Sequence, residues 1–340
     1  MIAVLSTFCL RLRFGACLFA AAIFAAIFAV PSASPAMDGE PAVGLPVFAA
    51  TPFEQPRLIE PPAQHPPPFS VNQQPLFLTP EMTQPESGDH GVLPGGLLYK
   101  SYIAGPHEPR FASVLLYDVS AGEWRWDSTL GGRLGLYRQG YSTFSDFDEW
   151  QIDVEGAVMS RLDPEKQMDV ESNDFRFGLL WTGRRDNLAV KFGYFHMSSH
   201  VGDEFLINNP TFTRINFVRE SIILGSSLQA TPQTRLYGEV AWAFAARGGA
   251  LPLQFQFGTE FSAIAPFPEH GAPFTALNVQ MREETDFAAG LTVMTGWQWT
   301  GLKSKRTMRV GMQYFNGPSN QYSFFRRYDN QFGLGLWIDF

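Results

Sequence analysis

The alternation of apolar and polar residues after residue 95 is the feature that most constrains the fold. In "WQIDVEGAV", Trp150, Ile152 and Val154 alternate with Gln151 and Asp153. The same period of two recurs in "DFRFGLLWTG", "LAVKFGYFH", "RLYGEVAWAFA", "GLTVMTGWQW" and "MRVGMQYF". Successive side chains of a strand point to opposite faces, so this period predicts strands with one apolar face each. The chain is therefore expected to be all-β.

Counting these strands back from the C-terminus gives about twelve, although ten or fourteen remain open because strand boundaries are hard to place. They are expected near 330–340, 305–315, 289–300, 274–285, 252–264, 233–247, 213–229, 187–199, 169–183, 149–162 and 124–138, with an earlier one within 97–117. An even number is what a closed bacterial barrel requires.

Two architectures fit such strands, a soluble sandwich and a transmembrane barrel. The chain has no second apolar run of spanning length, yet 14% of its residues are aromatic, and a barrel whose strands alternate explains both. The terminal "NQFGLGLWIDF" places Phe332, Leu334, Leu336 and Ile338 on one face with the terminal Phe340. This ending resembles the C-terminal assembly signal of bacterial outer-membrane barrels. The resemblance implies a transmembrane antiparallel β-barrel in the bacterial outer membrane, with the barrel assembly machinery as a partner of the last strand.

The N-terminal part has a different composition. Arg11 and Arg13 precede an uncharged run over 14–30 and then small residues up to Ala36, which predicts a signal peptide over 1–36; a retained membrane anchor is the alternative. Fifteen of the 25 prolines lie between residues 31 and 94, so residues 37–94 are expected to be a disordered Pro-rich segment. The barrel is assigned to residues 95–340.

Cysteine content and charge exclude several functions. Cys9 and Cys17 both lie in the predicted signal peptide, so the mature chain has no thiol for a disulfide or for catalysis. The formal net charge of the whole chain is −8, and nucleic acid is therefore not an expected partner.

The polar faces of the predicted strands carry both signs of charge. They include Asp127, Arg133, Asp153, Glu155, Asp174, Arg176, Lys191, Arg219, Glu239 and Arg309. Such a mixture suits a lumen closed by an ion-pair network better than a selective open pore.

His196 and Ser198 form the main candidate for chemistry. They share the apolar, outward parity of the strand 187–199 with Phe192 and Tyr194, where a polar pair is unexpected. Strand directions counted back from the C-terminus place the following loop, 199–212, outside the cell. The "HMS" stretch is similar to the His-x-Ser dyad of outer-membrane phospholipase A and of the outer-membrane lipid A 3-O-deacylases. That resemblance implies Ser198 as nucleophile and His196 as base, with an Asn or Glu after the loop orienting the histidine.

Two residues are candidates for that third role. A hairpin centred near Leu206 would place Asn216 opposite His196, and Glu204 in the loop is the competing residue. The phospholipase motif continues Asn-Gly after the serine, whereas Ser199 and His200 follow here, which leaves an oxyanion donor and a calcium site in doubt. Asp203 and Glu204 are weak candidates for binding calcium, the one cofactor considered. A site formed by His196, His200 and Asp203 is weaker still.

A wider resemblance covers nearly the whole barrel. The stretches "LPGGLLYKSYIAGPHEPR", "WDSTLGGRLGLYR", "FRFGLLWTGRRDNLAVKFGYFHMSSHVGDEF", "VGMQYFNGPSNQYSFF" and "GLGLWIDF" resemble a bacterial outer-membrane family known only as a domain of unknown function. This resemblance supplies no activity. The open hypotheses are a lipid acyl-ester hydrolase acting on phospholipid or lipid A, a non-enzymatic structural or interaction barrel, and a narrow channel. Outer-membrane lipid and lipopolysaccharide are the expected partners.

Overall fold

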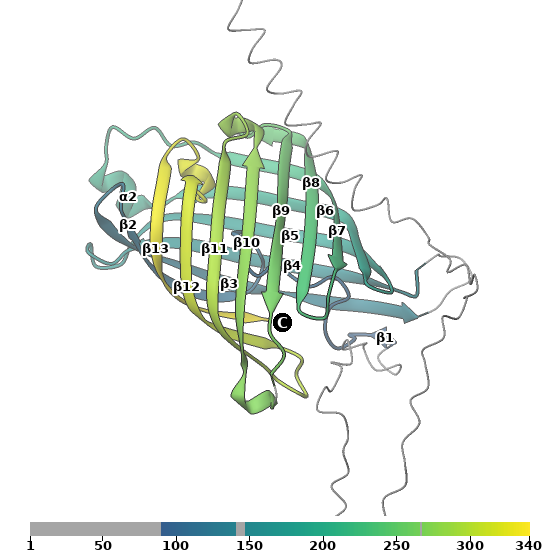
Figure 1. Ribbon diagram of the computed structural model, residues 1–340. Helices are drawn as coiled ribbons and strands as arrows, with labels where there is room; N and C mark the ends of the chain where they lie inside the picture. The colour runs from purple at the N-terminus through teal and green to yellow at the C-terminus, as the bar shows by residue number, and fades with distance from the viewer. Residues whose placement is uncertain (1–89, 141–146, 266) are drawn as a thin grey trace, which may run out of the picture.

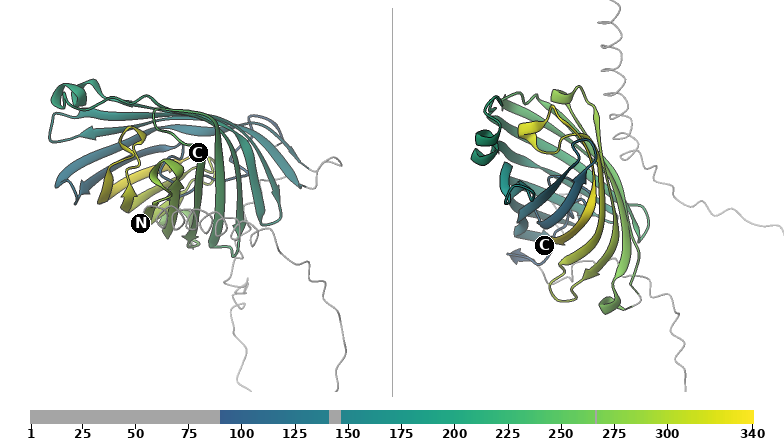
Figure 2. Two further views of the ribbon diagram at one scale, coloured as in Figure 1. Left: turned by 90° about the horizontal axis from the view of Figure 1, so that it is seen from above. Right: turned by 90° about the vertical axis from the view of Figure 1, so that its left-hand side faces the viewer.

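Twelve strands close into one antiparallel barrel (Figure 1). The computed structural model describes residues 90–140, 147–265 and 267–340. Consecutive strands from β2 to β13 are hydrogen-bonded neighbours, and β13 pairs with β2 to close the ring. In Figure 2 the teal strands and the yellow-green strands form opposite walls. The predicted all-β barrel of about twelve strands is confirmed.

The barrel strands lie close to their predicted positions. Their bounds are β2 Phe111–Asp118, β3 Glu123–Gly140, β4 Glu149–Asp163, β5 Asp169–Arg185, β6 Leu188–Val201, β7 Phe217–Gln229, β8 Thr234–Arg247, β9 Leu253–Ser262, β10 Ala272–Arg282, β11 Ala289–Thr300, β12 Thr307–Pro318 and β13 Tyr328–Asp339. A short strand, β1 (Gly91–Val92), pairs with the end of β3. The predicted signal peptide and the Pro-rich segment up to residue 89 lie outside the described residues.

Short helices occupy some of the connections. They are α2 (Asp203–Asn208), η1 (Pro268–His270), η2 (Glu283–Thr285) and η3 (Tyr322–Phe324). Within the described ranges, no helix is long and apolar enough to cross a membrane. We call the end of the barrel that carries residues 202–216 and 319–327 the loop end. The end that carries the tight turn at 186–187 and the C-terminus is the turn end.

The outward face of the barrel is apolar. Large exposed side chains on it include Leu130, Leu134, Phe175, Phe177, Leu179, Phe192, Leu224, Trp242, Phe244, Val310, Met312, Phe332 and Leu334. Aromatic residues border this surface at both ends. Tyr117 and Trp124 lie at the loop end with ring centroids 5.3 Å apart, and Tyr137 and Trp150 lie at the turn end with centroids 5.6 Å apart. An apolar band between two aromatic belts is the arrangement of a barrel wall that faces lipid.

The inward face carries most of the charged side chains of the strands, and many of them form ion pairs. Arg133 binds Asp153 at 3.1 Å, Arg176 binds Glu155 at 2.7 Å, and Lys191 binds Glu239 at 2.5 Å. Arg161 joins Asp127 and Asp329, at 2.8 and 2.9 Å. Because a buried ion needs a partner to offset its desolvation, these pairs allow a charged lumen to be filled rather than open.

The residues before β2 run through the lumen and form a plug, defined here as residues 93–110. Arg235 on β8 donates to the carbonyl oxygens of Lys100 and Ser101, at 2.7 and 3.1 Å. The Tyr102 ring stacks on Tyr237 with centroids 3.8 Å apart, and its hydroxyl lies 2.6 Å from that of Tyr99. The first barrel strand therefore begins only at Phe111, late in the predicted range.

The β12–β13 loop fills the lumen from the other end. The backbone N–H of Tyr322 donates to Asp174, at 3.1 Å, and that of Ser323 donates to Ser199, at 2.9 Å. The Tyr322 ring stacks on His107 of the plug, with centroids 4.5 Å apart. Plug and loop thus meet inside the barrel, and the prediction of a filled lumen with mixed charges is confirmed.

Candidate functional site

His196 and Ser198 lie on the outward face of β6, as the alternation predicts. Their neighbours Phe195, Met197 and Ser199 are buried inside the barrel, with at most 1% of their surface exposed. Outward and inward positions alternate without a bulge along β6 in its pairing with β5. Strand periodicity alone therefore brings imidazole and hydroxyl to one face.

The residue opposite His196 differs from the prediction. His196 pairs with Glu220 on β7, and Ser198 pairs with Val218. Asn216, the predicted partner, precedes β7 and is exposed, and Glu204 lies in the first turn of α2. The predicted register was wrong because α2 and the coil after it delay the start of β7 to Phe217.

Glu220 supplies the carboxylate that orients the histidine. Its Oε1 lies 2.9 Å from His196 Nδ1, and its Oε2 accepts a 2.5 Å hydrogen bond from the Tyr194 hydroxyl. About a third of the His196 side chain and 28% of the Glu220 side chain are exposed. With Nδ1 directed to the carboxylate, Nε2 remains for a second partner.

Ser198 lies close by but is not engaged by His196. It is flanked on the same face by Phe175 of β5 and Val218 of β7, and 9% of its surface is exposed. Among the described side chains there is no hydrogen bond between Ser198 and His196. Catalytic hydrogen bonds of this type are often long before substrate binds, so the spacing does not exclude a dyad.

A row of polar residues runs across the outward face beside this site. It is formed by Ser113, Ser128, Ser160, Asn173 and His200, each directly opposite the next on strands β2 to β6. We call it the boundary row. Ser160 donates to Asn173 at 2.5 Å, and Trp126 donates to Ser113 at 2.9 Å. Ser198 lies one outward position below His200, toward the apolar band.

The metal candidates do not converge. Asp203 and Glu204 are exposed in the first turn of α2. His200 packs edge-on against Phe175, with ring centroids 5.8 Å apart. Over the described part of the chain, no group of three or more His, Cys, Asp or Glu side chains could hold a metal ion.

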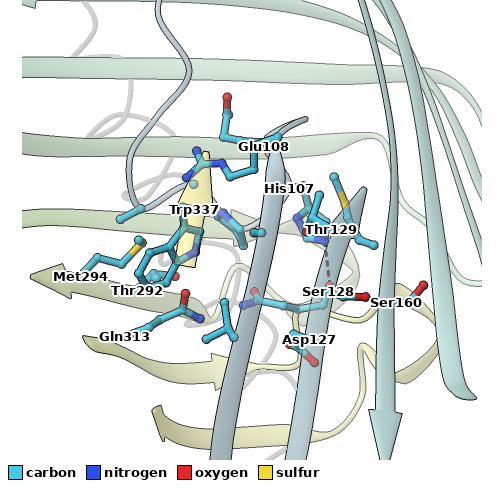
Figure 3. Close-up of a pocket in the computed structure, with 18 of the residues that line it drawn as sticks. His107, Glu108, Asp127, Ser128, Thr129, Ser160, Thr292, Met294, Gln313 and Trp337 are labelled. Carbon is cyan, nitrogen blue, oxygen red and sulfur yellow. Dashed lines mark hydrogen bonds between the residues drawn. The ribbon is translucent and has the colours of Figure 1, made fainter. Parts of the chain in front are cut away.

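The lumen contains a separate small cavity, between the plug and strands β2, β3, β11 and β12 (Figure 3). Its volume is about 60 Å³, and His107, Glu108, Asp127, Thr292 and Trp337 are among its lining residues. A space of this size is large enough for a few water molecules and too small for a lipid chain.

Sequence reasoning missed Glu220, although a signal for it exists. In "FVRESII", Glu220 shares the outward parity of Val218 and Ile222, so it is a carboxylate on an apolar face. No other carboxylate in the described strands occupies an outward position between the aromatic belts. A charge in that position is costly in contact with lipid, which marks Glu220 as a functional candidate.

Comparisons with known proteins place the chain in a family without an assigned activity. Its residues 73–340 match the family described as protein of unknown function (DUF1207), and no curated protein matches it. It is similar to the outer membrane phospholipase A from Escherichia coli, with 10% identity, coverage of 70% of this chain and 92% of that chain, and a TM-score of 0.46. A calcium-bound dimer of the Salmonella typhi outer membrane phospholipase gives 10% identity, coverage of 69% and 91%, and a TM-score of 0.46. Because the family match covers well over half of its length, the chain belongs to the DUF1207 family of proteins of unknown function.

Proposed function

We propose that this protein is a bacterial outer-membrane barrel that hydrolyses acyl esters of membrane lipid. Ser198 is the nucleophile, His196 the general base, and Glu220 the residue that orients His196. The observation that carries the proposal is the 2.9 Å contact between His196 Nδ1 and Glu220, with Ser198 one outward position away on the same strand.

The surface of the barrel supports the membrane location. Apolar side chains stay exposed around the outward face while charged ones are buried in the lumen, which inverts the pattern of a soluble sandwich. The plug and the β12–β13 loop argue against a channel, because both occupy the lumen through hydrogen bonds to the wall.

The level of the site on the wall suits ester chemistry. On β6 the outward residues are apolar from Leu188 to Phe192 and polar from Tyr194 to His200, and Ser198 lies in the polar part near the loop end. The acyl esters of membrane lipids lie at the transition between headgroup and hydrocarbon. A lipid lying along β5, β6 and β7 would thus bring its ester to the level of Ser198 without leaving the bilayer.

The chemistry follows from the three side chains. His196 Nε2 takes the proton of Ser198 as its oxygen bonds to the ester carbonyl carbon, and the Glu220 carboxylate stabilises the resulting imidazolium. When the ester C–O bond breaks, the departing alkoxide receives that proton from Nε2. Water, deprotonated by the same nitrogen, then attacks the acyl-serine, which releases the fatty acid and restores the hydroxyl.

The test is hydrolysis by refolded, purified barrel in mixed micelles of phospholipid or lipid A. Ser198→Ala and His196→Ala should abolish fatty-acid release, whereas Ser128→Ala, an outward serine of the boundary row, should release it at the wild-type rate. Glu220→Gln should lower kcat with little change in KM, because it weakens the orienting group and leaves nucleophile and base in place. Heat-modified electrophoretic mobility verifies folding of each variant. Equal rates in wild type and Ser198→Ala, or no release from any lipid, would refute the proposal.

A further inference from the structure

Four arginines are exposed at the loop end, Arg214, Arg247, Arg326 and Arg327, and the Arg327 guanidinium lies over the Phe324 ring, 4.0 Å from its centroid. None of them forms an ion pair with a carboxylate in the described part of the chain. Three acidic residues in neighbouring segments already have other partners. Glu220 binds His196 and Tyr194, Glu283 accepts from the backbone N–H of Leu253, and Glu284 lies 3.8 Å from Arg282.

Arg247 stands on the same face as Ser198. It is directly opposite Val218, which is directly opposite Ser198 on the next strand. Directly paired residues share a face of the sheet, so Arg247 points outward with them. Two strand spacings of about 4.8 Å place its Cα roughly 10 Å from that of Ser198. An arginine side chain that leans along the wall can therefore reach a group attached to an ester held at Ser198.

The turn after Arg247 fixes its position. Gly248 has a φ of +67°, and a Cβ there would lie 2.1 Å from the carbonyl oxygen of Asn216. A Cβ on Gly249 would lie 2.9 Å from the Phe325 ring. These close approaches require glycine. They bring the segments that carry Arg214 and Arg326 against the turn that carries Arg247.

We propose that Arg247, flanked by Arg214 and Arg326, binds the phosphate of the lipid whose ester meets Ser198. The inference rests on the proposed function and names its substrate class, an acyl-ester lipid with a phosphate group and net negative charge. Guanidinium groups bind phosphate through two parallel hydrogen bonds, and this cation is free of competing carboxylates. A phosphate held at the rim would direct the acyl chains down the apolar band past Ser198.

The site is tested by lipid binding, which does not require turnover. In the Ser198→Ala background, calorimetric titration in detergent micelles compares dihexanoyl phosphatidylglycerol with dihexanoylglycerol, which has the same acyl esters and no phosphate. Phosphatidylglycerol should bind about tenfold more tightly, the effect of one charged hydrogen-bonded contact. Arg247→Gln should remove that preference, whereas Arg185→Gln, an exposed arginine at the turn end, should retain it. Phosphorylated lipid A, compared with its dephosphorylated form, shows whether the phosphate of a glycolipid is also recognised.

Binding and hydrolysis separate the two proposals. If no lipid is hydrolysed but the preference depends on Arg247, the phosphate site stands and the enzymatic function fails. If wild type hydrolyses phosphatidylglycerol, Arg247→Gln should raise KM about tenfold at unchanged kcat. A preference unaffected by Arg247→Gln, or equal binding of the lipid with a phosphate and the lipid without one, would overturn the phosphate site alone.

Discussion

Replacing Arg235 should release the plug from the barrel wall. Its guanidinium is buried, donates to the carbonyl oxygens of Lys100 and Ser101, and lies 3.2 Å from Glu260. Glu260 in turn accepts from the backbone N–H of Ile103, at 2.7 Å. Arg235 thus holds the plug at three residues, Lys100 and Ser101 directly and Ile103 through its ion-pair partner Glu260.

The magnitude follows from what Arg235→Ala leaves behind. Two plug carbonyls lose charged donors, and Glu260 remains as a buried carboxylate without its cation. Removing one partner of a buried pair costs about 3–5 kcal/mol. The rate of cleavage follows the fraction of molecules with an open plug when the plug recloses quickly. Trypsin should therefore cut after Lys100 roughly 150- to 5000-fold faster in Arg235→Ala than in wild type.

The assay is limited proteolysis of the refolded barrel, with the cleavage site identified by mass spectrometry. Arg125→Ala is the matched control, because Arg125 is also buried and pairs with Glu123 and Glu171, both outside the plug. It should leave cleavage after Lys100 unchanged. Equal protection of that site in Arg235→Ala and wild type would refute the reasoning and show that the plug is held by other contacts.

Three other outcomes follow from the plug, its tyrosines and the topology. Wild-type protein in planar bilayers should show no steady conductance, and open steps of porin size would contradict a filled lumen. Burial raises the pKa of Tyr99 and Tyr102 above the usual value of 10, so their contribution to plug stability is complete below pH 10 and lost as pH rises beyond it. Cleavage after Lys100 should therefore accelerate above pH 10, and less so in the double variant Tyr99→Phe, Tyr102→Phe. Epitope tags at 203–209 should be accessible on intact cells and tags at 185–186 should not. The opposite labelling would show that the barrel has the opposite orientation in the membrane.

Strand positions were predictable because each strand has two physically different environments, one on each face. Apolar residues at every second position, with charged residues at the positions between them, indicate both that a segment is a strand and which of its faces points outward. For β11 the predicted range 289–300 is the one observed. The same alternation correctly assigned the inward charges, such as Arg133 and Lys191, without any knowledge of their partners.

The register of β6 with β7 could not be obtained in this way. Alternation fixes which residues face outward but allows any shift by two, and the loop length decides among these shifts. The "DEFLIN" stretch forms α2, so the strand begins four residues later than expected and Glu220 takes the place predicted for Asn216. Both residues have the same parity, which is why the error left the outward face intact.

Local sequence patterns could not predict the plug. "LPGGLLYKSYIAGPHEPR" has no sustained period, and the groups that hold it, such as Arg133, Arg235 and Glu260, come from strands far along the chain. Only closure of the barrel brings those groups to one side of the lumen. The sequence predicted a lumen of paired charges, but it could not show that these charges also bind backbone.

The filled lumen strengthens the case for chemistry on the outer wall. Its arginines and carboxylates are engaged with one another, with the plug and with the β12–β13 loop, and its cavity of about 60 Å³ is too small for a lipid chain. The outward face, by contrast, needs no polar group for stability in the proposed membrane location, where its surroundings would be hydrocarbon. Tyr194, His196, Ser198 and Glu220 lie together there on two adjacent strands, and Glu220 is the one carboxylate that the described strands place outward between the aromatic belts. Structural need does not account for a carboxylate in that position, whereas the role proposed for Glu220, orientation of the His196 imidazole, does.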